Sequence, residues 1–368
     1  MKQPKTSLHE YFERFPDHRI NRNKKHLLTD IIILSILGVL CGAESWDSIE
    51  TFGKTKLDFL RRFLKLPNGI PSHDTINRVF SGLRPQLFEK MFIEWVAGLK
   101  NDSINREVIS IDGKSIRGSK DSFYQQSPIH MVSAWASNNE LVLGQLKVTE
   151  KSNEITAIPL LLDLLDIEGS IITIDAMGTQ VEIAKKIIDN KADYILSLKS
   201  NQSELLDQVK ERFEKQQAQT TDVVNEKGHG RIESRKCEVI ADLTFIDNHI
   251  FWAGIKSAVR ITSTRILAGK ETSEMRYYIS SFIEDAVHFN RYIRMHWGIE
   301  NKLHWSLDMI FNEDRQRKRT KNAASNFSFI RKIGLNLLKK DPSKGSLVTK
   351  RLKAGWDNQY LLQVFNQI

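Results

Sequence analysis

Two short apolar runs of this chain each stop on an aspartate, and this pattern constrains the fold more than any other feature of the sequence. The first run is ISID, which ends at Asp112, and the second is IITID, which ends at Asp175. Short runs rich in isoleucine, each followed by a small residue and a turn, predict buried strands. Both carboxylates are therefore expected at the ends of strands.

The segments around these runs predict an α/β layer. Antiparallel strands followed by alternating helix and strand are typical of a mixed sheet, in which the first and fourth strands can lie side by side. Asp112 and Asp175 would then meet at one edge of the sheet, where open α/β sheets place their sites. The expected strands are 107–112, 128–137, 140–148, 170–175 and 192–200, and the expected helices are 154–169 and 179–191.

The remaining segments predict helices on either side of a β-rich block. Residues 31–43 are apolar nearly all round, but the run is shorter than the roughly 18–20 residues needed to cross a bilayer, so a buried helix is expected. A proline/glycine turn after residue 66, with Ser72 as a candidate cap, fits either a helix-turn-helix or a plain helical bundle. We predict an N-terminal helical, DNA-binding domain at 1–100, a core in two parts at 101–200 and 285–340, a β-rich insertion at 201–284 and a tail at 341–368.

The charge balance of the chain favours a polyanionic partner. The 368 residues carry a formal net charge of +9, which suits nucleic acid or an anionic membrane surface, although an ordinary basic protein is equally compatible with it. The two cysteines, Cys41 and Cys237, lack CxxC spacing, which argues against a disulfide scaffold and a cysteine zinc site. Residues 1–20 lack the apolar stretch of a signal peptide, so we expect a soluble, cytoplasmic protein.

Paired aspartates of this kind suit a hard divalent cation. Mg²⁺ prefers oxygen ligands, and two such ions about 3.5–4 Å apart can support an in-line displacement at phosphorus. A third carboxylate is then expected, and the candidate is Glu300, in a helical segment beside Ile299 and Leu303. The alternative for this residue is an exposed glutamate paired with a nearby base.

A histidine site competes with this interpretation of the Glu300 helix. His296, Glu300 and His304 are spaced at i, i+4 and i+8 and share one helix face, and paired histidines can bind zinc. The segment does not contain the H-E-x-x-H arrangement, and no cysteine lies nearby in the sequence. The histidines are therefore interpreted as partners of the metal ligands or as DNA contacts.

Basic residues cluster in the sequence next to the predicted site. They follow the first and fifth strands, alternate along one face of a strand at 229–235, and form a run at 315–321. Such groups contact phosphates without reading sequence, although a charge run is often only a solvated face. The predicted DNA contacts are Lys114, Arg117, Lys199, His229, Arg231, Arg235, Arg294, His296, Arg315 and Arg317.

Several long motifs give the chain a family resemblance. It resembles bacterial insertion-sequence transposases of the DDE class, in the branch that includes the H-repeat-associated proteins. The resemblance covers almost the whole chain. Its motifs include FPDHR (15–19), CGAESWDSIE (41–50), LPNGIPSHDTINRVF (66–80), SIDGKSIRGS (110–119), KSNEITAIPLLL (151–162), TIDAMGTQ (173–180), LKSNQ (198–202), HGRIESR (229–235), RYYISS (276–281) and HWGIENKLHWSLDMIFNEDR (296–315).

The resemblance implies a ribonuclease-H-like catalytic core with a β-rich insertion before the third carboxylate. It implies that Asp112, Asp175 and Glu300 are catalytic and bind Mg²⁺, for which Mn²⁺ can substitute. The implied activity is metal-dependent strand cleavage and strand transfer in DNA transposition and recombination. The implied partners are double-stranded DNA, at element ends and target, and a second copy of the chain on that DNA. A nucleoid-associated protein with no membrane partner is expected.

One motif of the family is not met. Relatives carry an arginine four residues before the third carboxylate and a lysine seven residues after it, whereas this chain has His296 and Leu307 there. Two other functions therefore stay open beside transposition. One is a nuclease with the same core that does not transfer strands, which a strand-transfer assay would separate. The other is a catalytically silent remnant that only binds DNA, which binding without cleavage would indicate.

Overall fold

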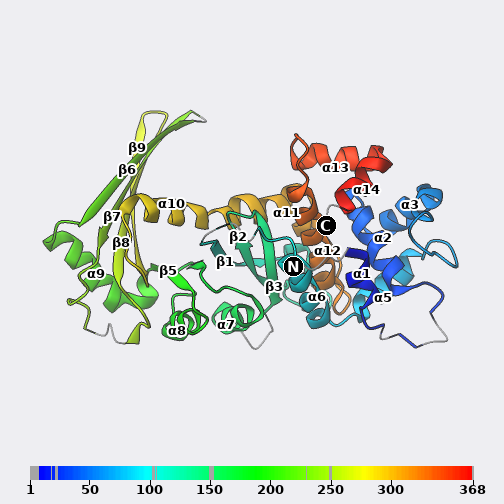
Figure 1. Cartoon of the computed structure of the whole chain (residues 1–368), viewed down its shortest axis with the longest axis horizontal. Helices are drawn as coiled ribbons and strands as arrows, with labels where there is room; N and C mark the ends of the chain where they lie inside the picture. The colour runs from blue at the N-terminus through cyan, green and yellow to red at the C-terminus, as the bar shows by residue number, and fades with distance from the viewer. Residues whose placement is uncertain are drawn as a thin grey trace, which may run out of the picture.

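The computed structural model describes residues 8–17, 19–20, 24–101, 104, 106–148, 153–228, 230–247 and 251–366. The molecule is elongated (Figure 1). A helical bundle lies at one end, a sheet with covering helices lies in the middle, and long β-hairpins project at the other end. In the described residues, no helix is both long enough and apolar enough to cross a membrane.

The middle of the molecule is a mixed α/β core, as predicted. Its strand order is β3-β2-β1-β4-β5, with β1 antiparallel to β2 and parallel to β4. All seven elements occur in the predicted order. Their bounds are β1 (Val108–Ser115), β2 (His130–Ala136), β3 (Leu141–Lys147), α7 (Glu154–Leu164), β4 (Ile171–Ile174), α8 (Val181–Asp189) and β5 (Asp193–Leu198).

The helix α7 ends earlier than the predicted limit at Gly169. Leu165 already has an extended backbone, with φ −101° and ψ 141°, so the helix stops at Leu164. Gly169 adopts a positive φ of 71° in the turn before β4, a conformation that glycine accepts without strain. The glycine was therefore a correct signal for a turn but not for the end of the helix.

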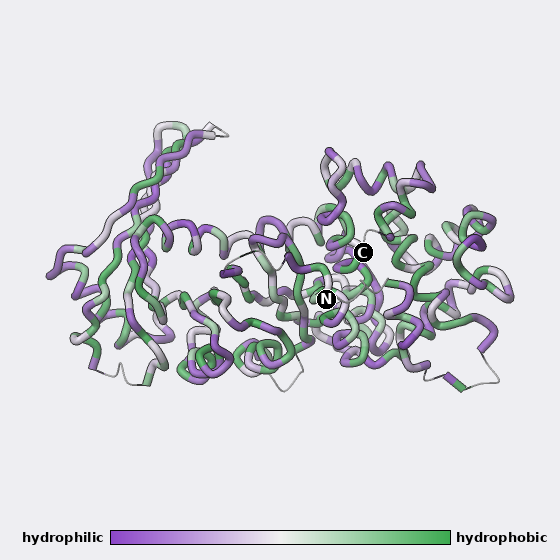
Figure 2. The backbone as a smooth tube through the Cα atoms, in the orientation of Figure 1, coloured by the Kyte–Doolittle hydropathy of each residue, from purple (hydrophilic) through white to green (hydrophobic). Residues whose placement is uncertain are grey.

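The β-rich segment extends the core sheet. After helix α9 (Ser203–Lys215), its last strand pairs antiparallel with β5, so one sheet of nine strands continues in the order β5-β9-β8-β7-β6. Figure 2 shows hydrophilic and hydrophobic residues interleaved along these hairpins. The strands are β6 (Thr220–Gly228), β7 (Arg231–Ile240), β8 (Ser257–Leu267) and β9 (Lys270–Ser280).

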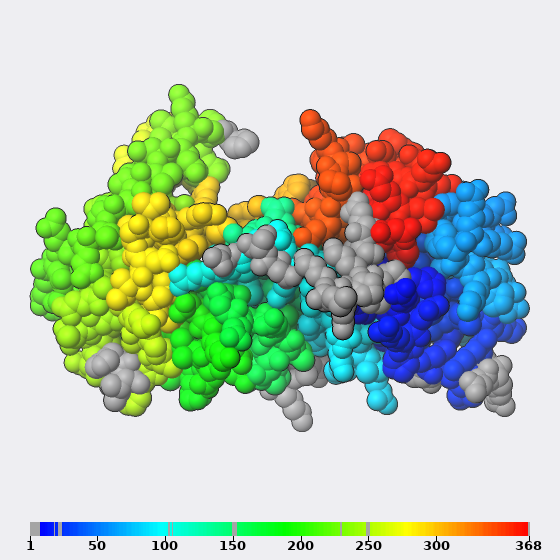
Figure 3. Space-filling model, viewed as in Figure 1, coloured from blue at the N-terminus to red at the C-terminus, as the bar shows by residue number. Residues whose placement is uncertain are grey.

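The N-terminal helices share their core with the C-terminal ones. Helix α2 (Leu28–Leu40) is buried along its whole length, as its all-round apolar sequence predicts, and helix α12 (Ala323–Lys340) packs against it. Figure 3 shows the C-terminal segment lying against the N-terminal helices. The other helices of the bundle are α1 (Leu8–Glu13), α3 (Trp46–Thr55), α4 (Leu57–Leu60), α5 (His73–Gly82), α6 (Pro85–Ala97), α13 (Leu347–Trp356) and α14 (Asn358–Phe365).

The predicted turn before α5 is present, but the helix before it is short. Ser72 caps α5 by accepting a hydrogen bond from the Thr75 amide at 3.3 Å, as predicted. The preceding helix α4 spans only four residues, from Leu57 to Leu60. The pair therefore differs from a helix-turn-helix built of two full helices and belongs to the bundle.

A broken helix crosses the sheet and carries the predicted third carboxylate. It consists of α10 (Ala286–His296), a π-helical turn (Ile299–His304) and α11 (Trp305–Met309). Helix α10 contacts β1 and β4, and the π-helical turn contacts β1 and β2. π-Helical turns are rare and occur frequently at functional sites, and this one contains Glu300.

Candidate active site

The register of the sheet places the two predicted aspartates side by side. The parallel pairing of β1 and β4 ends with Ile111 opposite Ile174, so Asp112 and Asp175 are the next residues on adjacent strands. Two residues earlier, the Thr173 hydroxyl donates to the Ser110 hydroxyl at 3.1 Å. The predicted meeting of the two strand ends is therefore confirmed.

The Asp112 carboxyl group lies in a mostly buried position surrounded by other acids. Its Oδ1 accepts a hydrogen bond from the Gly113 amide at 2.8 Å, and its Oδ2 lies 3.5 Å from His304 Nδ1. Burial raises the pKa of Asp112 to about 7, the Gly113 amide opposes this shift, and the negative charges of Asp175, Glu154 and Glu300 add to it. A cation bound among these carboxylates would relieve their repulsion, so the donor set fits a divalent metal ion.

Asp175 is oriented by the turn that follows its strand. Its Oδ1 accepts hydrogen bonds from the backbone amides of Met177 at 3.1 Å and Gly178 at 3.4 Å. Thr179 closes the same turn by donating to the Asp175 carbonyl oxygen at 3.2 Å. The turn that the sequence predicted after this strand therefore fixes one carboxylate oxygen and leaves the other available.

Glu300 lies at the surface, between two buried neighbours. Ile299 and Leu303 have no exposed surface, whereas Glu300 is exposed. The helix lies close to β2 at this point. A Cβ atom added at Gly298 would lie only 3.3 Å from Trp135 Nε1, which shows how little space separates the two elements. Glu300 is therefore exposed, as in the alternative given for it above, and its negative charge still acts on Asp112.

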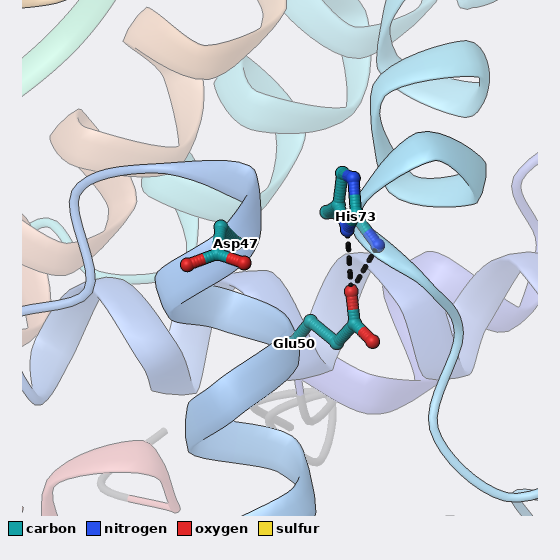
Figure 4. Close-up of side chains that lie close together, drawn as sticks. All are labelled: Asp47, Glu50 and His73. Carbon is teal, nitrogen blue, oxygen red and sulfur yellow. Dashed lines mark hydrogen bonds and ion pairs between the residues drawn. The ribbon is translucent and has the colours of Figure 1, made fainter.

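The three predicted carboxylates are not drawn together within metal-binding distance. In the described part of the chain, the one group of three ligand atoms within 4.8 Å of one another is Asp47, Glu50 and His73 (Figure 4). Those residues belong to α3 and α5 of the helical bundle, and Glu50 is already paired with Lys54 at 2.5 Å and with His73 at 2.7 Å. That cluster is accounted for by its own ion pairs.

A fourth carboxylate at the same edge escaped the sequence analysis. Glu154 begins α7 beside the strand end, and His130 Nε2 lies 2.6 Å from Glu154 Oε1. The other ring nitrogen of His130 bonds the Ser115 hydroxyl at 2.9 Å. Any side chain at Gly113 would overlap both Glu154 and His130. A sequence signal for Glu154 did exist. Asn153 is a helix cap and places Glu154 at the start of α7. Because β3 runs parallel to β1, the chain that leaves β3 brings the start of α7 to the same edge as Asp112.

The two histidines of the broken helix contact different strands. His296 Nδ1 bonds the Thr173 hydroxyl at 2.9 Å, and burial lowers the pKa of His296 to about 4. Burial lowers the pKa of His304 to about 3, and the charges of Lys332 and Lys114 add to this shift. Both rings are therefore neutral at pH 7, and His296 packs on the sheet instead of reaching outward.

The predicted DNA-contacting residues fall into two groups. Lys114 has an ammonium group held by Asp308 at 2.7 Å, Asp314 at 3.0 Å and Glu313 at 3.4 Å, which gives it an internal structural role. The side chains exposed at the surface are Arg117, Lys199, Arg294, Arg315 and Arg317. Two of them have acidic partners there, since Arg117 lies 3.4 Å from Asp314 and Arg294 lies 3.3 Å from Glu226. His229 lies outside the described residues.

A cavity of about 840 Å³ joins the hairpins to the Glu300 helix. Arg235 in its wall donates to Asn290 Oδ1 at 2.6 Å, and Arg276 lies 4.6 Å from the centre of the Trp297 ring. Glu300 also lines the cavity. The basic residues in the wall are Arg231, Arg235, Arg265, Arg276, Arg294 and Lys302, so three predicted contacts share one space with Glu300.

Known protein families and relatives match this chain along nearly its whole length. Residues 104–337 match the family described as Transposase DDE domain, and residues 9–96 match the family described as DDE_Tnp_1-associated. The "H repeat-associated putative transposase YhhI" of Escherichia coli K12 is 42% identical over 369 residues, which is 97% of each chain. The "Putative transposase YncI" of Escherichia coli O157:H7 is 43% identical, over 97% of this chain and 94% of its own length.

A solved structure gives only a distant likeness. A piggyBac transposase in a synaptic complex with hairpin DNA overlaps 97% of this chain and 76% of its own, with a TM-score of 0.41 and 12% identity. That similarity is too slight to bear on the site.

Proposed function

This chain belongs to the family of transposases with a DDE domain, and from that premise we propose that it transposes an insertion sequence. It binds the ends of the element, cleaves DNA strands there and joins them to a target. The observation that carries the proposal is the register of β1 and β4, which brings Asp112 and Asp175 to adjacent strand ends. Carboxylates arranged in this way suit phosphoryl transfer.

Asp112, Asp175 and Glu300 are the proposed ligands of Mg²⁺, for which Mn²⁺ can substitute. A divalent ion supplies Lewis-acid stabilisation of charged phosphate oxygens and activates an oxygen nucleophile. The protein's part is to hold the carboxylates in place. The amides of Met177 and Gly178 orient Asp175, and the Gly113 amide orients Asp112.

The exposed cations are the proposed contacts to the DNA backbone. Arg117, Arg315 and Arg317 lie on segments next to β1 and α11, and Lys199 follows β5. The cavity wall with Arg231, Arg235 and Arg294 would face the DNA near Glu300, and the helices of residues 1–100 would recognise the element ends. Phosphate contacts of this kind supply affinity that falls as the salt concentration rises. Two ends must be joined, so the active form is proposed to be a homodimer on DNA.

The test is cleavage of a DNA duplex that carries the element's own end, in Mg²⁺ and in Mn²⁺. Wild type is compared with Asp112→Asn, Asp175→Asn and Glu300→Gln, and DNA binding is measured for each protein. Cleavage by wild type alone, with binding kept in all three variants, supports the proposed ligands. A wild type that binds without cutting refutes the catalytic proposal, and a Glu300→Gln variant that still cuts refutes the third ligand.

Strand transfer needs a separate measurement. A pre-cut end is mixed with wild-type protein and a target plasmid, and joined products are counted. Joining supports a transposase, whereas cleavage without joining supports a nuclease with the same core.

A further inference from the structure

The loop between β1 and β2 displays two neighbouring aromatic side chains to solvent. Phe123 is 86% exposed and Tyr124 is 74% exposed. Their ring centres lie 4.9 Å apart in an edge-to-face arrangement. Large aromatic side chains are usually at least partly covered, so a pair this exposed at one loop tip calls for a partner.

Hydrogen bonds within the loop hold the pair in place. Asp121 Oδ1 accepts from the amides of Phe123 at 3.0 Å and Tyr124 at 3.3 Å. Backbone bonds of 3.0 and 2.8 Å join Asp121 to Gln126, and the Ser119 hydroxyl donates to the Ile116 carbonyl at 2.7 Å. These hydrogen bonds give the loop a defined conformation, in which both rings point outward.

The base of the loop is fixed against the segment that leads into the basic run. A Cβ atom at Gly118 would lie 2.7 Å from the Asp314 carbonyl oxygen and would also overlap the backbone of Gln316. Only glycine allows this approach, which seats the loop beside the 3₁₀ turn Glu313–Arg315. The base of the loop therefore lies beside segments that carry exposed basic side chains, namely those of Arg117, Lys120, Arg315 and Arg317.

The loop also leaves the sheet at the edge that carries the carboxylates. Strand β1 continues from Asp112 to Ser115, which is about 10 Å of extended chain, before the loop begins. DNA held at the strand ends would lie within reach of the loop. Aromatic rings flanked by cations match the chemistry of a nucleic acid strand, whose bases stack on the rings while its phosphates pair with the cations.

We propose that Phe123 and Tyr124 stack on unpaired bases of the DNA strand at the site, with Arg117 and Arg315 on its phosphates. This inference rests on the proposed function, because it assumes that DNA occupies the carboxylate edge. A second copy of the chain is a poorer occupant, since a symmetric contact through this region would set its cations against one another. Exposed rings gain from stacking on bases that are already unstacked, so the loop favours frayed or opened ends over intact duplex.

The test compares two DNA probes that differ only in pairing. One is a fully paired duplex and the other has the same sequence with a short unpaired stretch at one end. Binding is measured by fluorescence anisotropy in EDTA, and 2-aminopurine in the unpaired stretch reports stacking. Wild type is expected to bind the frayed probe about 10-fold more tightly than the paired one, with quenching of 2-aminopurine.

The variants separate stacking from charge and from apolarity. Phe123→Ala/Tyr124→Ala should lose the preference and the quenching while keeping its affinity for the paired duplex. Phe123→Leu/Tyr124→Leu keeps an apolar tip and should lose both as well, whereas Arg315→Ala should weaken binding to both probes equally. Circular dichroism spectra check that the variants fold.

Four results overturn the inference. Equal binding of the two probes by wild type refutes it and leaves the proposed function standing, whereas no binding of either probe refutes the proposed function as well. Loss of self-association in the alanine variant, seen by light scattering with DNA preference unchanged, identifies a second copy as the occupant. Loss of binding to phosphatidylserine vesicles, again with DNA preference unchanged, identifies a membrane surface.

Discussion

Replacing Glu313 by glutamine should destabilise the protein strongly, because this buried carboxylate balances two buried cations and a third that is partly buried. Glu313 is 1% exposed. Its Oε2 lies 3.4 Å from Lys114 Nζ, and its Oε1 lies 3.6 Å from Arg331 Nη1. Lys332 is also buried nearby and adds to the positive charge that Glu313 balances. Glutamine keeps the shape but removes the charge.

The expected loss follows from leaving a buried charge unpaired. Arg331 is 2% exposed, and Glu313 is its carboxylate partner among the described residues. Removing one member of such a buried pair costs about 3–5 kcal/mol. At about 2.1 cal/mol/K of unfolding entropy per residue, a chain of 368 residues should lose about 5 °C in Tm.

The pKa of Glu313 predicts how the effect depends on pH. Burial alone would raise this pKa, but the charges of Lys114, Arg331 and Lys332 outweigh burial and lower it. A lowered folded-state pKa means that the carboxylate stabilises the protein above its ordinary pKa of 4.5 and loses this contribution as the pH falls. The difference in stability between wild type and Glu313→Gln should therefore be full near neutral pH and shrink in acid.

Calorimetry and urea unfolding at neutral and acid pH measure these changes. The matched control is Glu274→Gln, which removes an exposed carboxylate paired with Arg276 at 2.8 Å and should cost less than about 1 kcal/mol. Adding Arg331→Leu to Glu313→Gln should restore part of the loss, because the unpaired charge is then removed too. A Glu313→Gln protein within about 1 kcal/mol of wild type at neutral pH would refute the reasoning.

Three further predictions concern the bundle and the site. Burial raises the pKa of Glu89 to about 7, so the protonated side chain contributes its full stability below the ordinary pKa of 4.5, and this contribution is lost as the pH rises through 7. The free energy of unfolding of Glu89→Gln, measured with urea, should therefore exceed that of wild type by up to about 3 kcal/mol near pH 8 and by little near pH 4. Gly113→Ala should displace Glu154 and His130 and cut strand cleavage at least about 10-fold in a gel assay, while Gly228→Ala, in open space, should not. Arg317→Ala should reduce the slope of log affinity against log salt by about one unit in anisotropy titrations, for any DNA sequence.

The core and its strand-end aspartates could be predicted because both depend on local patterns. Apolar runs of strand length, separated by amphipathic helices, were enough to order the elements from residue 107 to 200. The pairing of β1 with β4 followed from that order, and with it the meeting of Asp112 and Asp175. The burial of α2 followed from its apolar residues on every side.

Contacts between distant segments could not be predicted in the same way. Lys114 looks like a surface cation in the sequence, but it is neutralised by acids about 200 residues later, from Asp308 to Asp314. Glu154 reads as an ordinary first-turn helical glutamate until β3 is seen to deliver it to the site. The pairing of β9 with β5 likewise depends on packing that no local pattern encodes.

The shared bundle has a consequence for how the protein is made. Helix α2 leaves the ribosome about 280 residues before α12, which covers it in the finished fold. At about 5–20 residues per second, its apolar surface waits on the order of 14–56 s for its partner. A gene copy that stops before α12 leaves that surface permanently bare, so truncated copies are expected to aggregate or be degraded instead of persisting as separate N-terminal domains. Expression of residues 1–100 alone, followed by a solubility assay, tests this expectation, and a soluble, cooperatively folded product would contradict it.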